Sequence, residues 1–198
     1  MRKISLLLIT LILLVGCSSQ APEVTPQPPQ KERHQIKFTI SEKEYTLPTP
    51  FQEFADSDWI IDLDPEFILK AGTYIENQAI RKDKYYLLLA FYNDSDTDKA
   101  IKDTTVVSVQ AEDRYVIWHY HDEVPSDIVL EPNIKWGFQE SLAGSLYDTT
   151  AKVEQNNVYK TYVYELEKNQ RIGLRYSLDD MELQFIELKD FGPDPNFD

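Results

Sequence analysis

The sequence predicts an α+β fold in which short helices pack on antiparallel β-meanders. Three observations lead to this prediction. Several segments alternate apolar and polar residues, as strands with one buried face do. Two segments start with Thr-Pro or Asp-Pro, which is a helix-start signal, and a third has an apolar residue at every fourth position. Both kinds of segment occur in each half of the chain. We therefore expect two similar halves, each built from a short helix and antiparallel strands.

The first segment, residues 1–16, is typical of an export signal. A basic start and an apolar core reaching Val15 precede the small residue Gly16. The apolar run is too short to cross a bilayer. Cys17 then follows an aliphatic, aliphatic, small triplet, and this pattern resembles the lipobox of bacterial lipoproteins. The resemblance implies that Cys17 is diacylglycerylated and becomes the mature N-terminus, at the extracytoplasmic face of the cell membrane. The alternative is an ordinary unpaired thiol, which is unusual in an exported protein.

Residues 17–35 are expected to form a lipidated, Pro-rich tether. The stretch after Cys17 is polar, contains four prolines and shows no apolar period. In polyproline II form, at about 3.1 Å per residue, it could hold a domain on the order of 50 Å from the membrane. Two acyl chains give stable anchoring where one gives only marginal binding, at roughly 0.8 kcal/mol per buried methylene.

The charge of the chain limits its partners. Removing residues 1–16 removes Arg2 and Lys3, which leaves 18 of the 20 basic residues against 34 acidic residues and a formal net charge of about −16. Such a surface argues against nucleic acid as a partner. Anionic lipid should also repel the domain, so that the lipid anchor and not surface charge keeps it at the membrane.

The first module is expected over residues 36–124. Alternation over residues 36–47 predicts a β-hairpin. Thr49-Pro50 with Gln52 predicts a short helix through about Asp56, and Asp64-Pro65 predicts a second one that ends at Gly72. The nearly all-apolar run 84–93 predicts a central strand covered on both faces, followed by a turn over residues 93–98 and a β-branched strand over 104–109.

The second module is expected over residues 125–191, with a C-terminal tail over 192–198. An apolar stripe after Gly137 predicts a helix; its members are Phe138, Leu142 and Leu146. Three alternating strands follow, and a phase shift between Phe185 and Ile186 in the third predicts a β-bulge. The pattern leaves open whether the two halves form one continuous sheet or two modules.

Spaced aromatics and glycines carry a resemblance to known families. The first half resembles uncharacterised surface lipoproteins of Gram-positive bacteria, through Phe38, Tyr45-Thr46-Leu47-Pro48, Trp59, Gly72-Thr73-Tyr74 and Asn93. Asp58 stands where those proteins usually have glycine. The second half, from Ile134-Lys135-Trp136-Gly137 on, resembles the helix-then-meander repeat of β-lactamase inhibitor proteins and small outer-membrane assembly lipoproteins, but it lacks their Gly-x-Pro after the helix. The resemblance implies a non-enzymatic binding module without naming a ligand.

Two segments could be considered as metal sites. His119 and His121 are two residues apart, which places them on one face of a strand, where they could share a zinc or copper ion. A polar strand edge explains them more simply, and no cofactor is predicted. Asp94, Asp96 and Asp98 mimic the first ligands of a calcium loop, but Lys99 stands where that loop needs glycine. We therefore interpret them as a solvated turn.

The sequence contains no motif for nucleophilic catalysis, neither Gly-x-Ser-x-Gly nor Ser-x-x-Lys. Aromatic residues could line a groove for sugar or peptide, and Trp59, Trp118 and Trp136 are the candidates. Core and cross-strand packing is the competing interpretation. The leading hypothesis is a membrane-anchored lipoprotein of the cell envelope whose ectodomain binds a protein partner or an envelope component without catalysis. The alternatives are a tethered hydrolase of cell wall or polysaccharide and a solute-binding lipoprotein.

Overall fold

Antiparallel β-sheet dominates the structure, a computed structural model that describes residues 33–112, 123 and 125–192. Strands contain 51% of these described residues and helices 7%. The α+β prediction is therefore supported only loosely. In the described part of the chain, every helix is too short or too polar to cross a membrane.

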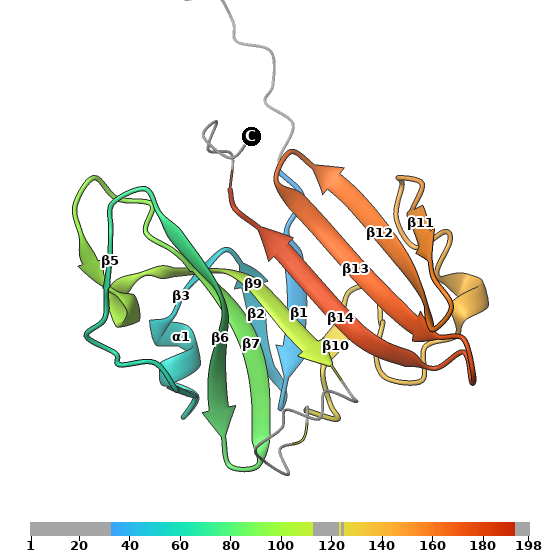
Figure 1. Cartoon of the computed structure of the whole chain (residues 1–198), viewed down its shortest axis with the longest axis horizontal. Coiled ribbons are helices and arrows are strands. Elements are labelled where there is room, and N and C mark those ends of the chain that lie inside the picture. Colours follow the sequence, from blue (N-terminus) through green and yellow to red (C-terminus); the bar gives the residue numbers. More distant parts are fainter. Residues whose placement is uncertain (1–32, 113–122, 124, 193–198) are drawn as a thin grey trace, which may run out of the picture. The chain divides into compact units, whose positions relative to one another are not determined.

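The largest sheet has nine strands and runs through both halves of the chain (Figure 1). Its order is β11-β12-β13-β14-β9-β7-β6-β4, and β3 also pairs with β9. Its strands are β3 (Thr49–Pro50), β4 (Ile60–Ile61), β6 (Tyr74–Lys82), β7 (Tyr85–Tyr92), β9 (Thr105–Glu112), β11 (Lys152–Gln155), β12 (Tyr159–Glu167), β13 (Gln170–Ser177) and β14 (Leu183–Asp190). Because β14 pairs with β9, the expected modules 36–124 and 125–191 share one sheet.

Two small sheets and three short helices complete the described fold. One sheet has the order β10-β1-β2 and the other pairs β5 with β8. The strands are β1 (Ile36–Ile40), β2 (Lys43–Leu47), β5 (Ile68–Leu69), β8 (Lys99–Ala100) and β10 (Val129–Leu130). The helices are α1 (Gln52–Ala55) and the 3-10 helices η1 (Ile101–Asp103) and η2 (Glu140–Leu142). β10 pairs with β1, so it is a second place where the two halves meet.

The hairpin predicted over residues 36–47 is confirmed by β1 and β2. Ile40 pairs with Lys43 across a two-residue turn, Ser41-Glu42. Both turn residues have positive φ, 51° and 65°, as a type I′ turn requires. This turn places Ile36, Phe38 and Ile40 on the same buried face of β1.

The central strand predicted over residues 84–93 is confirmed by β7, which lies between β6 and β9. Leu87 and Leu89 are fully buried on its inner face. On its other face, Ala90 and Tyr92 belong to a smaller buried cluster. A strand covered on both sides in this way has no polar face, which explains its nearly continuous apolar sequence.

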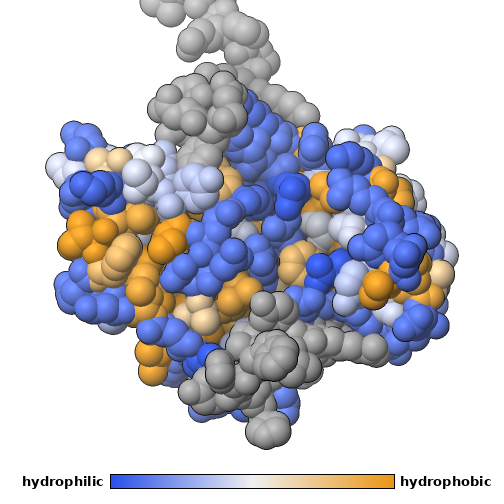
Figure 2. All heavy atoms as spheres, viewed as in Figure 1, coloured by the Kyte–Doolittle hydropathy of each residue, from blue (hydrophilic) through white to orange (hydrophobic). Residues whose placement is uncertain are grey.

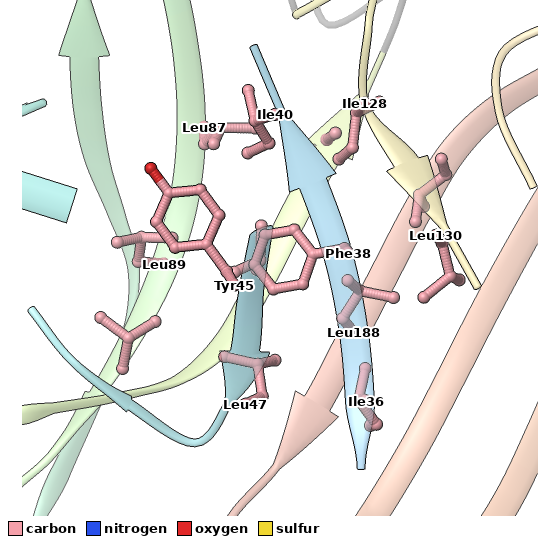
Figure 3. Close-up of a cluster of buried hydrophobic side chains, with 14 of the residues drawn as sticks. Ile36, Phe38, Ile40, Tyr45, Leu47, Leu87, Leu89, Ile128, Leu130 and Leu188 are labelled. Atoms are coloured by element: carbon pink, nitrogen blue, oxygen red, sulfur yellow. The ribbon is translucent and has the colours of Figure 1, made fainter. Parts of the chain in front are cut away.

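The sheet β10-β1-β2 covers the inner face of the large sheet and forms the main core with it (Figure 3). The Phe38 ring stacks on the Tyr45 ring at 5.4 Å, and Tyr45 stacks on Phe54 of α1 at 4.5 Å. Leu89 of the first half and Leu188 of the second half lie in the same cluster (Figure 3). Each such side chain contributes about 1.5–3 kcal/mol when it is fully buried.

The first predicted helix exists but begins later than expected. Helix α1 covers Gln52–Ala55 with Phe51 as N-cap, and no side chain caps it. Thr49, the expected cap, lies instead in β3, where it pairs with Val106. The Thr-Pro pair thus forms a short strand instead of a helix start. Proline is tolerated at the edge of a sheet because it has no N–H group that would need a hydrogen-bond partner.

The helix predicted after Asp64 is wrong. The Asp64 carboxylate accepts the Glu66 N–H at 3.0 Å, and the Asp64 carbonyl accepts the Phe67 N–H at 2.8 Å, which closes a single turn. The chain then extends, and Ile68 pairs with Ala100 of β8. A one-turn motif uses the same start signal as a helix, and pairing with a distant strand ends it.

The helix predicted after Gly137 is also wrong. Only the 3-10 helix η2 forms there, and Leu142, the middle member of the predicted stripe, is 51% exposed while Ala143 is buried. Gly137 has φ of 80°, a turn conformation outside the helical region. A bulge is present in β14, but it lies at Gln184 and not between Phe185 and Ile186, because Arg175 and Tyr176 pair with Phe185 and Leu183.

We predict that Phe38→Ala destabilises the protein by about 3–5 kcal/mol, because it removes a buried ring shared by the two packed sheets. The measurement is urea unfolding of the full chain. Val153→Ala, at a position that is 49% exposed, is the control and should change the free energy of unfolding by less than about 0.5 kcal/mol. Equal effects of the two substitutions would contradict this description of the core.

Candidate functional site

Four of the residues singled out from the sequence lie outside the described residues. They are Cys17, Trp118, His119 and His121. The lipidation site and the histidine pair therefore stay predictions. Among the described residues, no group of three or more His, Cys, Asp or Glu side chains is placed to hold a metal ion.

The two described tryptophans both have structural contacts. Trp59 is buried, 4% exposed, and lies in the main core. Tyr45 lies in the same core, and burial is the chief cause that raises the pKa of its hydroxyl. Trp136 is half-buried and donates its indole N–H to the Pro125 carbonyl at 2.9 Å. Both tryptophans thus have a role inside the fold, as the packing interpretation expects.

The turn after β7 is organised by Asn93, which is fully buried. Its amide nitrogen donates to the carbonyls of Leu69 and Thr97 at 3.0 and 2.8 Å, and its oxygen accepts from the Ser95 hydroxyl at 2.7 Å. Asp98 accepts the Ala71 N–H at 3.0 Å. Asn93 and Asp98 therefore fix the turn against the segment around β5 through hydrogen bonds.

The outer face of the large sheet carries a network of ion pairs. The Arg175 guanidinium lies between the Tyr159 and Phe185 rings, at 4.7 and 4.4 Å from their centroids, and pairs with Glu112. Burial raises the pKa of the Glu112 carboxyl, and Arg175 opposes this shift. Beside this pair, Glu187 bonds Arg171. The opposite charges in this network compensate one another, as is usual for the solvent-facing side of a sheet.

A second polar cluster fixes η2 to the inner side of β12. Glu140 forms an ion pair with Lys160 at 2.7 Å and accepts the Tyr162 hydroxyl. The hydrogen bond from Lys160, and next that from Tyr162, lower the pKa of Glu140. Tyr164, on the same strand, donates its hydroxyl to the Ala143 carbonyl just after η2. These contacts fix the segment around η2, for which the sequence predicted a helix.

The most distinctive exposed surface is at the end of the domain where β5 pairs with β8. We define this surface, the β5–β8 corner, as residues 64–71 and 93–103. Backbone hydrogen bonds join its two segments: Ile101 donates to the Phe67 carbonyl at 2.8 Å, and Ile68 pairs with Ala100. Lys102 also pairs with Glu66. The corner is therefore a single bonded structure and not two separate loops.

Large apolar side chains of the β5–β8 corner face the solvent. Ile68 is 55% exposed and Phe67 41%. Figure 2 shows hydrophobic residues gathered on the side of the molecule where β5 lies, whereas the middle of the same face is mainly hydrophilic. Leu69, next to Ile68, is buried and packs the strand against the core. An exposed apolar patch with a polar rim is typical of an interaction site.

The sequence reasoning missed this corner because it placed Phe67 and Ile68 in a helix. One signal was available, since residues 52–69 hold six acidic residues and no basic one.

Comparison of the chain with protein-family models, with curated proteins and with solved structures gives no match.

We predict that Glu140→Gln flattens the acid dependence of stability. Because the folded pKa of Glu140 is lowered, its contribution is present above the unfolded pKa, about 4.3, and is lost as the pH falls through the folded pKa. Urea unfolding at pH 7 should show a loss of about 1 kcal/mol in the variant. Between pH 5 and about pH 3 the wild-type chain should lose more stability than the variant. Parallel pH profiles would contradict this role for Glu140.

Proposed function

We propose that this chain is a lipoprotein of the bacterial cell envelope, anchored through acylated Cys17, whose β-rich domain binds a protein partner without catalysis. The observation that carries the proposal is the run Leu14-Val15-Gly16-Cys17 after a short basic and apolar segment. Two acyl chains on one sulfur would anchor the chain stably at the extracytoplasmic face.

The first described residues support a tether that ends at a fixed point on the domain. Arg33 donates to the Asp190 carboxylate at 2.6 Å, and Asp190 is 1% exposed. The Gln170 amide donates to the His34 carbonyl at 2.6 Å and to Asp190 at 2.5 Å. A buried charged pair with additional hydrogen bonds holds its geometry well. The Pro-rich stretch would thus join a domain whose first residues are bonded to its last strand.

The described surface supports binding over catalysis. On the outer sheet face the charged groups are paired with one another, as Arg175 is with Glu112 and Arg171 with Glu187. The β5–β8 corner is different, because it exposes apolar side chains that the fold itself leaves uncovered. Surfaces of this kind are typical of contacts between proteins.

The anchor is tested by labelling cells with a palmitate analogue. We expect the wild-type chain to carry the label and to sediment with membranes. Cys17→Ala should carry no label, since the acylated sulfur is absent. Cys17→Ser serves as the conservative control and should behave like Cys17→Ala. A labelled Cys17→Ala chain, or an unlabelled wild-type chain with a free thiol in mass spectrometry, would refute the proposal.

A further inference from the structure

We propose that the β5–β8 corner docks a cationic segment of a partner protein that also carries apolar side chains. The inference rests on the proposed function, in which the domain binds a protein, and adds where the contact lies and what chemistry the partner has. Two independent properties of the corner carry it: an apolar patch held rigid by the backbone, and an excess of acidic residues around that patch.

The apolar patch consists of Phe67 and Ile68, which are adjacent in the chain. Its backbone is fixed before any partner arrives, because Ile68 pairs with Ala100 and the Phe67 carbonyl accepts the Ile101 N–H at 2.8 Å. The buried amide of Asn93 holds the Leu69 carbonyl at 3.0 Å. A preorganised surface loses little conformational entropy on binding, which favours affinity.

The net charge around the patch is negative. The corner holds six acidic residues against three basic ones. The acidic residues are Asp64, Glu66, Asp94, Asp96, Asp98 and Asp103. Glu66 forms an ion pair with Lys102, which leaves five acidic residues against Lys70 and Lys99. The rim therefore attracts cations and repels anions.

Charge complementarity selects the occupant. A second copy of this chain would bring the same acidic rim against itself, and like charges that face each other across an interface cost several kcal/mol. Anionic lipid and nucleic acid are repelled for the same reason. A protein segment with Lys or Arg beside apolar side chains satisfies both the rim and the patch.

The test places a photoreactive amino acid at Ile68 in the full chain, in the cells that express it. We expect a covalent adduct whose cross-linked peptide, sequenced by mass spectrometry, has a positive net charge and apolar residues. The matched control is the same photoreactive residue at Val158, which is 53% exposed but lies directly before β12. Val158 should give at least about tenfold less adduct, the ratio that 1.4 kcal/mol of local binding energy would produce.

Charge variants test the rim separately from the patch. Asp94→Asn, Asp96→Asn and Asp103→Asn together should reduce the Ile68 adduct several-fold, because rim charges steer association. The control removes three negative charges from exposed positions of the other half, with Asp127→Asn, Glu131→Gln and Asp148→Asn, and should leave the adduct yield within about twofold.

Several results would overturn the inference. These are no adduct at Ile68, equal adducts at Ile68 and Val158, an adduct with a second copy of the chain or with lipid, and equal effects of the two triple variants. The anchor is assayed independently by the palmitate label. An acylated chain without an Ile68 adduct would refute the docking site but leave the proposed lipoprotein anchor standing. An unacylated chain with a cationic Ile68 adduct would refute the anchor but leave the docking site standing.

Discussion

The pairing of β14 with β9 is the constraint on which the rest of the described fold depends. It runs from Phe185 opposite Glu112 to Lys189 opposite Ser108 and joins strands from the two halves of the chain. Only the combined sheet provides the inner face that β10-β1-β2 covers, and that small sheet itself takes β10 from the second half. Leu89 and Leu188 consequently share one core cluster, so neither half buries its apolar face alone. Contacts this distant in sequence carry a loop-closure cost, which the shared core must offset.

Local patterns predicted the strands whose burial alternates or is continuous, and little else. The hairpin of β1 and β2 could be predicted because Ile36, Phe38 and Ile40 face one side and a two-residue turn follows. β6 could not, because a positive φ at Asn77 and a register shift between Ile75 and Gln78 break its period. β11 was missed for another reason, since all four of its residues are exposed and carry no apolar pattern.

The two wrong helices show why start signals alone are not sufficient. A start signal specifies one turn, and continuation depends on whether the apolar residues beyond it share a buried face. After Asp64, the next apolar residue that could extend a helical face, Ile68, is bonded into a strand and exposed. After Gly137, Leu142 is exposed while Phe138 is only partly buried against the core. The information that decides both cases lies in β8 and β12, far along the chain.

The site was less predictable than the fold. A tryptophan in a sequence offers apolar area and one N–H group, and both the core and a ligand can use them. Trp59 and Trp136 are used by the fold, through burial in the main core and through a bond to the Pro125 carbonyl. The β5–β8 corner depends on Phe67 and Ile68 being in a strand, which the sequence did not reveal. Its acidic bias was readable, but an acidic run without an exposed apolar patch is more simply a solvated surface.

A small apolar patch would suit a protein that is confined to a membrane, as we propose for this chain. A stable interface between free proteins typically buries about 800 Å² on each partner, and two exposed apolar side chains supply a fraction of that area. The proposed anchor would change the requirement, because attachment of two partners to one envelope converts their encounter into a local event at raised effective concentration. The first described residues of the domain are bonded to its last strand, through Arg33 and Asp190. The proposed tether would therefore comprise the residues between Cys17 and Arg33, and a shorter linker gives a higher effective concentration. In this proposal, electrostatic steering would set how fast a cationic partner arrives, and the shared membrane would set how often it returns.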